Sequence, residues 1–301
     1  MTATRARDLP TALDPGPALV GGRPGRRRVR RPVRWLVLLL AVVVAALMLS
    51  PFLLLVLNAF KTGADYSSHG PMAFPRTFTL DAFRSYLGTV DYPRALINST
   101  IISVVVASAG TAIALMSAYA IGVGRVRGGA ALLAVLLLAT MVPHEALIYP
   151  LFYGAQATQT LNTVWSVIIV FTVLQAAFGT YVLSSVLGTF PRELLEAGAI
   201  DGATRWQLLW RIVLPVLRPT LSVLVVFFFI WTWNEFYIPL VLLSDPDAQT
   251  VPIALSTLRG QHSIDITVLN AGSLLSLLPT LAFFLIFQRT LSRGITAGSV
   301  K

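Results

Sequence analysis

The chain has no cysteine, few charged residues and only two lysines. Of its 301 residues, 12% are charged, about half the share found in soluble globular domains, which makes an ordinary soluble enzyme a poor fit. The absence of cysteine excludes disulfides, thiolate zinc sites, iron–sulfur clusters and cysteine nucleophiles. Apolar residues make up 55% of the chain, and the formal net charge is +10. Composition alone leaves two partners open for that charge, nucleic acid or a membrane.

The charged residues are separated by long apolar gaps. No charged residue lies between Trp35 and Phe60, between Ala95 and Gly124, or between Ile266 and Gln288, and these gaps span 26, 30 and 23 residues. A helix that crosses a membrane needs about 20 apolar residues. Two further gaps contain few ionisable groups, and the polar stretch 154–162 divides the longer one. We therefore predict an all-α membrane protein with six transmembrane helices, at about 35–58, 97–121, 130–152, 163–187, 219–243 and 268–288.

Basic residues lie mainly on one side of the predicted membrane. The two tails and the loops 122–129 and 188–218 hold 18 of the 23 basic residues and five acids, a balance of +13, whereas the other side holds five basic and six acidic residues. Because positively charged loops stay in the cytoplasm, both termini are predicted to be cytoplasmic. Residues 1–34 are predicted to form a disordered, arginine-rich cytoplasmic tail near anionic headgroups. No nucleic-acid-binding fold accompanies this tail, so nucleic acid is not expected as a partner.

Small residues and prolines are placed at regular points in the predicted helices. The second helix has a face of small residues, which allows close helix packing: Ser103, Ala107, Gly110, Ala114 and Ala118. Prolines interrupt the other helices and are expected to kink them: Pro51, Pro143, Pro150, Pro239 and Pro279.

Three ionisable residues, His144, Glu145 and Glu235, fall inside predicted helices. Such groups are costly in lipid and face either the protein interior or a water-filled path, and both alternatives remain open. A zinc-protease motif would need a second histidine at position 148, where the chain has Ile148, so no metal site is expected. The aromatic and polar run 231–237 suits either a polyhydroxylated ligand or an interfacial aromatic belt. The candidates for a substrate path are Glu145, Trp233, Asn234 and Glu235.

The loop 188–218 differs from the others because it is long and amphipathic. Its turn and cap signals are Pro191 for a first helical turn, Asp201-Gly202 for a tight turn, a capping box of Thr204 and Gln207, and Pro215. These signals predict a short helix, a turn and a second helix over 205–214 that Pro215 ends or kinks. The loop suits docking to a partner, although an amphipathic helix on the membrane surface would have a similar sequence.

The same loop carries a spaced motif. Glu196-Ala197-Gly198, three residues, Gly202, nine residues, Ile212, one residue and Leu214-Pro215 resemble the EAA loop of ABC importer permeases. The family usually has Ala where this chain has Gly198. Flanking segments such as Met141–Pro143, Trp231–Phe236 and Arg293–Lys301 are similar to carbohydrate importers of the maltose type, in particular their smaller permease subunit. The resemblance covers residues 35–301.

The resemblance implies a function that this chain performs with partners. It implies a type I ABC importer permease in the cell membrane, which has no cofactor and is not an enzyme, moving a sugar or oligosaccharide inward. The implied partners are an ATP-binding subunit dimer, a second permease subunit and an extracytoplasmic sugar-binding protein. The residues implied to couple to the ATPase are Glu196, Ala197, Gly198, Asp201, Gly202, Ile212, Leu214 and Pro215, together with the tail 294–301. The outer loop Ser244–Leu269 is implied to engage the binding protein.

The positions of the lysines also indicate that ATP is hydrolysed on another polypeptide. A P-loop requires a lysine between a glycine and a serine or threonine, and the only lysines are Lys61, which follows Phe60, and the terminal Lys301. Two alternatives remain open. One is an importer of another solute, such as a polyol, a glycerol phosphate or a peptide. The other is an ion-coupled secondary transporter, which would be expected to have ionisable groups at mid-membrane.

Overall fold

The computed structural model describes residues 31–124, 126–258 and 265–297, and all regular secondary structure in these ranges is helical. The predicted tail up to residue 30, Arg259 and residues 298–301 lie outside the described residues. The chain divides into two units after Pro51, and each unit is considered by itself. Helix α1 (Arg31–Ala59) begins in the first unit and contains Pro51. Because proline has no N–H, the carbonyl of Leu47 loses its helical donor, and the Ser50 hydroxyl donates to that carbonyl at 2.8 Å instead.

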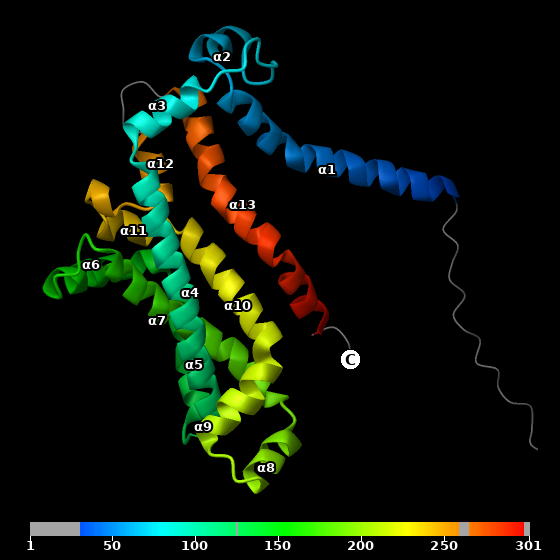
Figure 1. The fold of residues 1–301 in the computed structure, drawn as a ribbon, viewed down its shortest axis with the longest axis vertical. Helices are drawn as coiled ribbons and strands as arrows, with labels where there is room; N and C mark the ends of the chain where they lie inside the picture. Colours follow the sequence, from blue (N-terminus) through cyan, green and yellow to red (C-terminus); the bar gives the residue numbers. More distant parts are fainter. Residues whose placement is uncertain (1–30, 125, 259–264, 298–301) are drawn as a thin grey trace, which may run out of the picture. The chain divides into compact units, whose positions relative to one another are not determined.

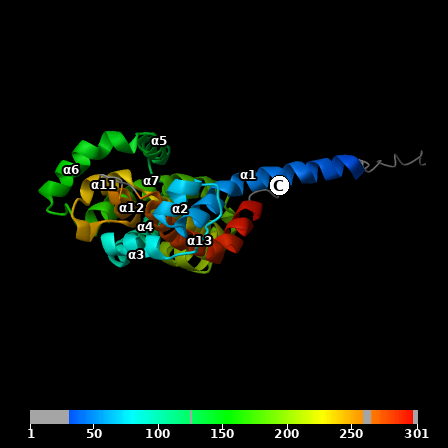
Figure 2. The ribbon, with the colours of Figure 1, turned by 90° about the horizontal axis from the view of Figure 1, so that it is seen from above.

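The second unit is a bundle built on long helices. Helix α4 (Tyr92–Gly122) packs along both α7 (Val164–Gly188) and α10 (Leu214–Asn234), and α13 (Ile266–Ala297) packs on α10 (Figure 1). Seen from above, α5 and α6 lie to one side of α7 and α4 (Figure 2). We call the end of the bundle that contains α8 (Arg192–Ile200) the α8 end. The opposite end, which contains α12 (Val251–Thr257), is the α12 end.

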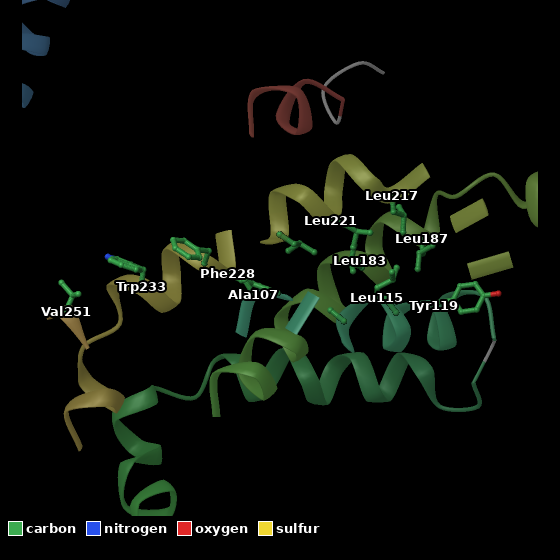
Figure 3. Packing of buried hydrophobic residues seen from close by; sticks show 14 of the residues in the cluster. Ala107, Leu115, Tyr119, Leu183, Leu187, Leu217, Leu221, Phe228, Trp233 and Val251 are labelled. Carbon is green, nitrogen blue, oxygen red and sulfur yellow. The ribbon is translucent and has the colours of Figure 1, made fainter. Parts of the chain in front are cut away.

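The small face predicted for the second helix is confirmed as a packing surface. All five of its small residues are buried. The closest approach is at Gly179 on α7, where an added Cβ would lie 2.8 Å from the Ala114 Cβ and 3.0 Å from the Phe228 ring. An added Cβ at Gly110 would meet ordinary contacts at 3.6 Å. Figure 3 shows the buried cluster around this crossing, with Leu115, Leu183, Leu217 and Phe228 among its labelled members.

The predicted third span is not one straight helix. Among the described residues, five helices are long and apolar enough to cross a membrane, and a sixth span exists only if two helices bent by 93° are counted together. The bent pair is α5 (Gly129–Thr140) and the segment formed by the short 3₁₀ helix η1 (His144–Leu147) and α6 (Ile148–Ala157). Pro143 explains the break, because the residue before a proline is forced out of the helical region and proline itself donates no hydrogen bond.

The predicted fifth span begins and ends earlier than the apolar run suggests. Helix α9 (Arg205–Leu208), the π-helical turn η2 (Leu209–Val213) and α10 form one continuous helix up to Asn234. Pro215 does not end the second loop helix, because the helix continues through it, and the π-helical turn η2 lies directly before this proline. The helix instead breaks at Glu235, and the remainder of the predicted span is the separate helix α11 (Tyr237–Leu242).

Short helices cover the α12 end. They are α2 (Gly63–His69), α3 (Asp81–Thr89), the 3₁₀ helix η3 (Pro246–Ala248) and α12. Helix α3 packs on α13, and the ring of Tyr86 occupies the space that a side chain at Gly272 would need. Burial raises the pKa of Tyr86 to about 12. Pro279 in α13 deprives the Leu275 carbonyl of its helical donor, and the Tyr92 hydroxyl donates to that carbonyl at 2.8 Å.

Candidate functional site

The loop between α7 and α10 forms a sharply capped helical turn. Helix α8 ends with the N–H of Gly202 donating to Ala199 and the N–H of Ala203 donating to Gly198, at 3.1 and 3.0 Å. These two bonds make a Schellman motif, which needs a residue with positive φ between them. Gly202 supplies it with a φ of +79°. Any other residue there would be strained, because only glycine adopts this conformation without steric cost.

Helix α9 starts with the predicted capping box. The backbone N–H of Gln207 donates to the Thr204 hydroxyl at 3.3 Å, and the backbone N–H of Thr204 donates to the Gln207 side chain at 2.8 Å. The Schellman motif and the capping box follow one another within a few residues. Together they fix the direction of α8 relative to α9 by local hydrogen bonds.

The structure separates the eight residues of the loop motif into three groups. Four are exposed on α8 and its turn: Glu196, Ala197, Asp201 and Gly202. Gly198 is buried and faces Ile212. Leu214 and Pro215 lie in the first turn of α10. The motif therefore contains both an exposed surface and an internal packing contact.

Several exposed apolar side chains at the α8 end were not expected. On α8, Ile200 is 86% exposed and Leu194 is 44% exposed. Trp206 and Trp210 are also exposed, and their rings pack edge to face at 5.4 Å. Their spacing of four residues was the available signal, because residues four apart share one face of a helix. A cavity of about 230 Å³ separates α8 from the ends of α4 and α7.

The two broken helices meet beside His144. Its ring stacks on Trp231 at 6.3 Å and meets the edge of Phe171 at 6.3 Å. His144, Phe171, Trp231 and Gln175 all line a cavity of about 30 Å³. This volume is large enough for a water molecule. The Gln175 side chain is 2% exposed and donates to Thr232 at 2.7 Å, whereas its carbonyl oxygen has no hydrogen-bond partner among the described residues. Gln175 was not predicted from the sequence as a site residue, because it carries no charge that would mark it.

The four residues proposed for a substrate path are not equivalent. Trp233 is 3% exposed and stacks on Phe229 at 5.7 Å, so it belongs to the packed interior and does not line a path in this conformation. Asn234 and Glu145 are exposed, and Glu235 is half-buried, with its carboxylate accepting from the Tyr237 N–H at 3.3 Å. Among the residues with described positions, no group of three His, Cys, Asp or Glu side chains could hold a metal ion.

The segment that follows α11 is tied to the bundle by polar side chains. Asn162 has a φ of +60°, and its side-chain oxygen accepts from the N–H groups of Ser244 and Asp245 at 2.8 and 3.1 Å. From α4, Arg94 forms an ion pair with Asp247 at 3.1 Å. Two further α4 side chains bond the same segment: Asn98 donates to two of its carbonyls, and Ser99 accepts the Val251 N–H. Residues 244–251 of the predicted outer loop are therefore held in place, whereas 259–264 lie outside the described residues.

A bundle of helices long enough to cross a membrane, two of them broken, is the architecture of a membrane transport protein. Residues 110–296, more than half of the chain, match the family described as "Binding-protein-dependent transport system inner membrane component". The chain belongs to this family. It is the membrane-spanning permease component of a transport system that depends on a binding protein.

Several similar proteins agree with this assignment. The chain is 31% identical over 283 residues to the arabinooligosaccharides transport system permease protein AraQ of Halalkalibacterium halodurans. The aligned region covers 92% of this chain and 99% of AraQ. It is 32% identical over 280 residues to the lactose transport system permease protein LacG of Rhizobium radiobacter, covering 92% and 98%. A crystal structure of a bacterial ABC transporter that imports the acidic polysaccharide alginate matches 87% of this chain and 98% of its own, with a TM-score of 0.73 and 18% identity. At that identity the alginate transporter shows the fold alone.

Proposed function

We propose that the chain is one membrane subunit of an ABC importer that carries a sugar or oligosaccharide inward, driven by ATP hydrolysis on separate subunits. The observation that carries this proposal is the α8–α9 loop, where Glu196, Ala197, Asp201 and Gly202 are exposed around a Schellman turn. The relatives at 31% and 32% identity are named as permeases for arabinooligosaccharides and lactose. Their names support a carbohydrate as the transported solute.

In this proposal the α8 end of the bundle is cytoplasmic and the α12 end faces outward. The excess of basic residues in the tails and in the loops 122–129 and 188–218 supports this orientation. Residues 35–301 form the permease domain, and residues 1–34 form an arginine-rich cytoplasmic tail. A second, different permease subunit completes the pore.

The exposed surface of α8 docks into the ATP-binding subunit dimer. Ile200 and Leu194 expose apolar side chains at this tip, and Glu196 and Asp201 add negative charge beside them. Apolar groups surrounded by polar ones are typical of a protein interface. Closure of the ATP-bound dimer moves the loop and shifts the bundle between inward-open and outward-open states, through a difference in binding free energy between the two states.

The solute passes beside the junction of the two broken helices. Non-helical backbone at membrane depth is tolerated only inside protein or along a water-filled cavity. Asn234, Glu235 and Glu145 lie on or next to the broken segments, and each offers hydrogen-bond acceptors for hydroxyl groups. Trp233 has no direct role in this path, because it is buried.

The binding protein docks at the α12 end. The side chains of Asp245, Pro246 and Asp247 are exposed there. Their backbone is fixed by Asn162 from one side and by Arg94 from the other. A rigid, exposed acidic tip suits recognition of a partner without a large cost in loop ordering.

The test starts from the full chain, expressed with an N-terminal affinity tag so that the C-terminal tail stays native. Proteins retained in mild detergent are identified, and the solute carried by the retained binding protein is determined by native mass spectrometry. The purified complex is then reconstituted into vesicles, and uptake of the labelled solute is measured with and without ATP.

We expect a carbohydrate on the binding protein and uptake that requires ATP but resists a protonophore. A polyol, a glycerol phosphate or a peptide on the binding protein would overturn the sugar assignment. Uptake that continues without ATP and stops with the protonophore would overturn the ATP-driven mechanism in favour of ion coupling.

A further inference from the structure

A groove of about 270 Å³ lies between α10 and α13, along the first three turns of α10. The two helices pack side by side (Figure 1). Helix α10 lines the groove with residues whose spacing places them on one face of the helix: Leu214, Arg218, Leu221, Ser222 and Val225. Helix α13 adds Phe287. The groove is therefore a mainly apolar strip with one cationic side chain.

The length and surroundings of the groove suit a lipid chain. Both α10 and α13 belong to helices that are long and apolar enough to cross a membrane. Next to Phe287, α13 exposes the apolar side chains of Leu285 and Ile286. From Leu214 to Val225 the helix rises about 16 Å at 1.5 Å per residue. This length is close to the thickness of one leaflet, which is half of a hydrocarbon core of about 30 Å.

Of the described residues that line the groove, Arg218 alone carries a charge. Its side chain is exposed and forms no hydrogen bond or ion pair with the residues that the structure describes. Ser222, the other polar residue of the groove, donates its hydroxyl to the Arg218 carbonyl at 2.8 Å. Neither α10 nor α13 contains an aspartate or a glutamate. The Arg218 guanidinium is therefore available to an anion from outside the chain.

We propose that the groove holds one acyl chain of an anionic phospholipid, whose phosphate binds the Arg218 guanidinium. Arginine presents a planar fork of donors that matches a phosphate group. Its apolar stem lies along apolar surface while its charged head extends toward the headgroups. Over about 16 Å, a groove of 270 Å³ has room for one hydrocarbon chain, whereas a helix from another subunit is about 10 Å across. The volume and the charge thus favour a lipid.

The test uses the full chain with the subunits that co-purify with it, in mild detergent and stripped of native lipid. Native mass spectrometry counts the phosphatidylglycerol molecules that bind as this lipid is added back, and yields an apparent dissociation constant. Phosphatidylcholine with the same acyl chains tests the headgroup, and inorganic phosphate tests the anion without a chain. We expect one tightly bound phosphatidylglycerol for each copy of this chain, and weaker binding of both other probes.

Matched variants localise the bound lipid. Arg218→Gln should weaken phosphatidylglycerol binding about fivefold, the contribution of one basic residue near a membrane surface, and should leave phosphatidylcholine binding unchanged. Arg211→Gln is its control, because Arg211 is exposed on the same continuous helix but does not line the groove. Ser222→Phe fills the groove and should weaken the binding of both lipids, whereas Ser222→Ala leaves the groove open and should not.

Four results would overturn the proposal. They are equal losses for Arg218→Gln and Arg211→Gln, equal binding of the two lipids by the parent, binding of inorganic phosphate as tight as that of phosphatidylglycerol, and lipid binding that Ser222→Phe leaves unchanged. The last result would mean that the groove is empty or covered by another subunit. If Arg218→Gln does not assemble, the pair Ser222→Phe and Ser222→Ala decides. Uptake is not part of this measurement, so a failure of the proposed function is recognised separately.

Discussion

Replacing Asn162 should release the segment that follows α11 from the bundle. The side-chain oxygen of Asn162 accepts two backbone hydrogen bonds, from Ser244 and Asp245. Its own N–H donates to the Leu242 carbonyl at 2.9 Å. Its φ of +60° lies in the left-handed region, which asparagine tolerates better than most residues. Asn162→Ala removes both acceptor contacts and leaves alanine in an unfavourable conformation.

The free-energy cost of Asn162→Ala follows from the two lost hydrogen bonds and the left-handed backbone. A hydrogen bond of this kind contributes about 0.5–1.5 kcal/mol. The lower half of that range applies here, since the N–H groups lie near solvent, which gives roughly 1–2 kcal/mol for the pair. Left-handed backbone adds about 1 kcal/mol for alanine. The expected total of about 2–3 kcal/mol makes local opening roughly 30- to 150-fold more frequent, at tenfold per 1.4 kcal/mol.

The natural absence of cysteine allows a direct assay of this opening. Ala248→Cys places one thiol at a position that is 8% exposed, so its reaction with a water-soluble maleimide requires the segment to open. The labelling rate is measured in this background with Asn162 intact and with Asn162→Ala, Asn162→Gly and Asn162→Asp. The glycine variant loses the acceptor without the left-handed strain, and the aspartate variant keeps the acceptor.

We expect the rate to rise most for Asn162→Ala, less for Asn162→Gly and little for Asn162→Asp. Equal rates for Asn162→Ala and the parent would refute the argument that Asn162 fixes the segment. A rate for Asn162→Asp as high as for Asn162→Ala would show that the acceptor oxygen is not what matters.

Three further predictions use the same reasoning. Gly179→Ala should lower the unfolding temperature, because the added methyl group overpacks the crossing of α4 and α7 by about 1–3 kcal/mol. Gly110→Ala is the control and should leave the unfolding temperature unchanged or slightly higher. Equal shifts in the two unfolding temperatures would contradict the structure. Tyr92→Phe should cost about 1–3 kcal/mol because the Leu275 carbonyl, deprived of its helical donor by proline, loses its partner; unchanged thermal stability would argue against that bond. Gly202→Val should break the Schellman turn and reduce uptake per ATP hydrolysed while membrane insertion stays normal; unchanged uptake would count against the coupling role.

The features that the sequence predicts well depend on neighbouring residues. Membrane-length helices follow from apolar runs, because a helix in lipid must satisfy its own backbone hydrogen bonds. The tight turn at Gly202 and the capping box at Thr204 follow from side chains a few residues apart, and both are present. The small face of α4 follows from helical periodicity and is buried as expected.

The features that the sequence does not predict depend on contacts between distant segments. Hydropathy treats residues 219–243 as one continuous span, although α10 ends at Asn234 and a separate helix begins at Tyr237. Trp233 lies in an aromatic and polar run that suits a ligand, and only the tertiary structure shows that it stacks on Phe229 in the interior. The role of Asn162 depends on two backbone groups 82 and 83 residues away, which no local pattern specifies.

The sequence by itself therefore determined the class of protein, the approximate helices and the capped turn between α8 and α9, because hydrophobic length, capping and turn formation are local properties. The tertiary structure decided where α10 ends, which polar residues hold the segment that follows α11, and how closely α4 and α7 approach at Gly179. The physical reason is that these features arise from close packing, where a single methyl group either fits or does not, and that fit depends on partners distant along the chain.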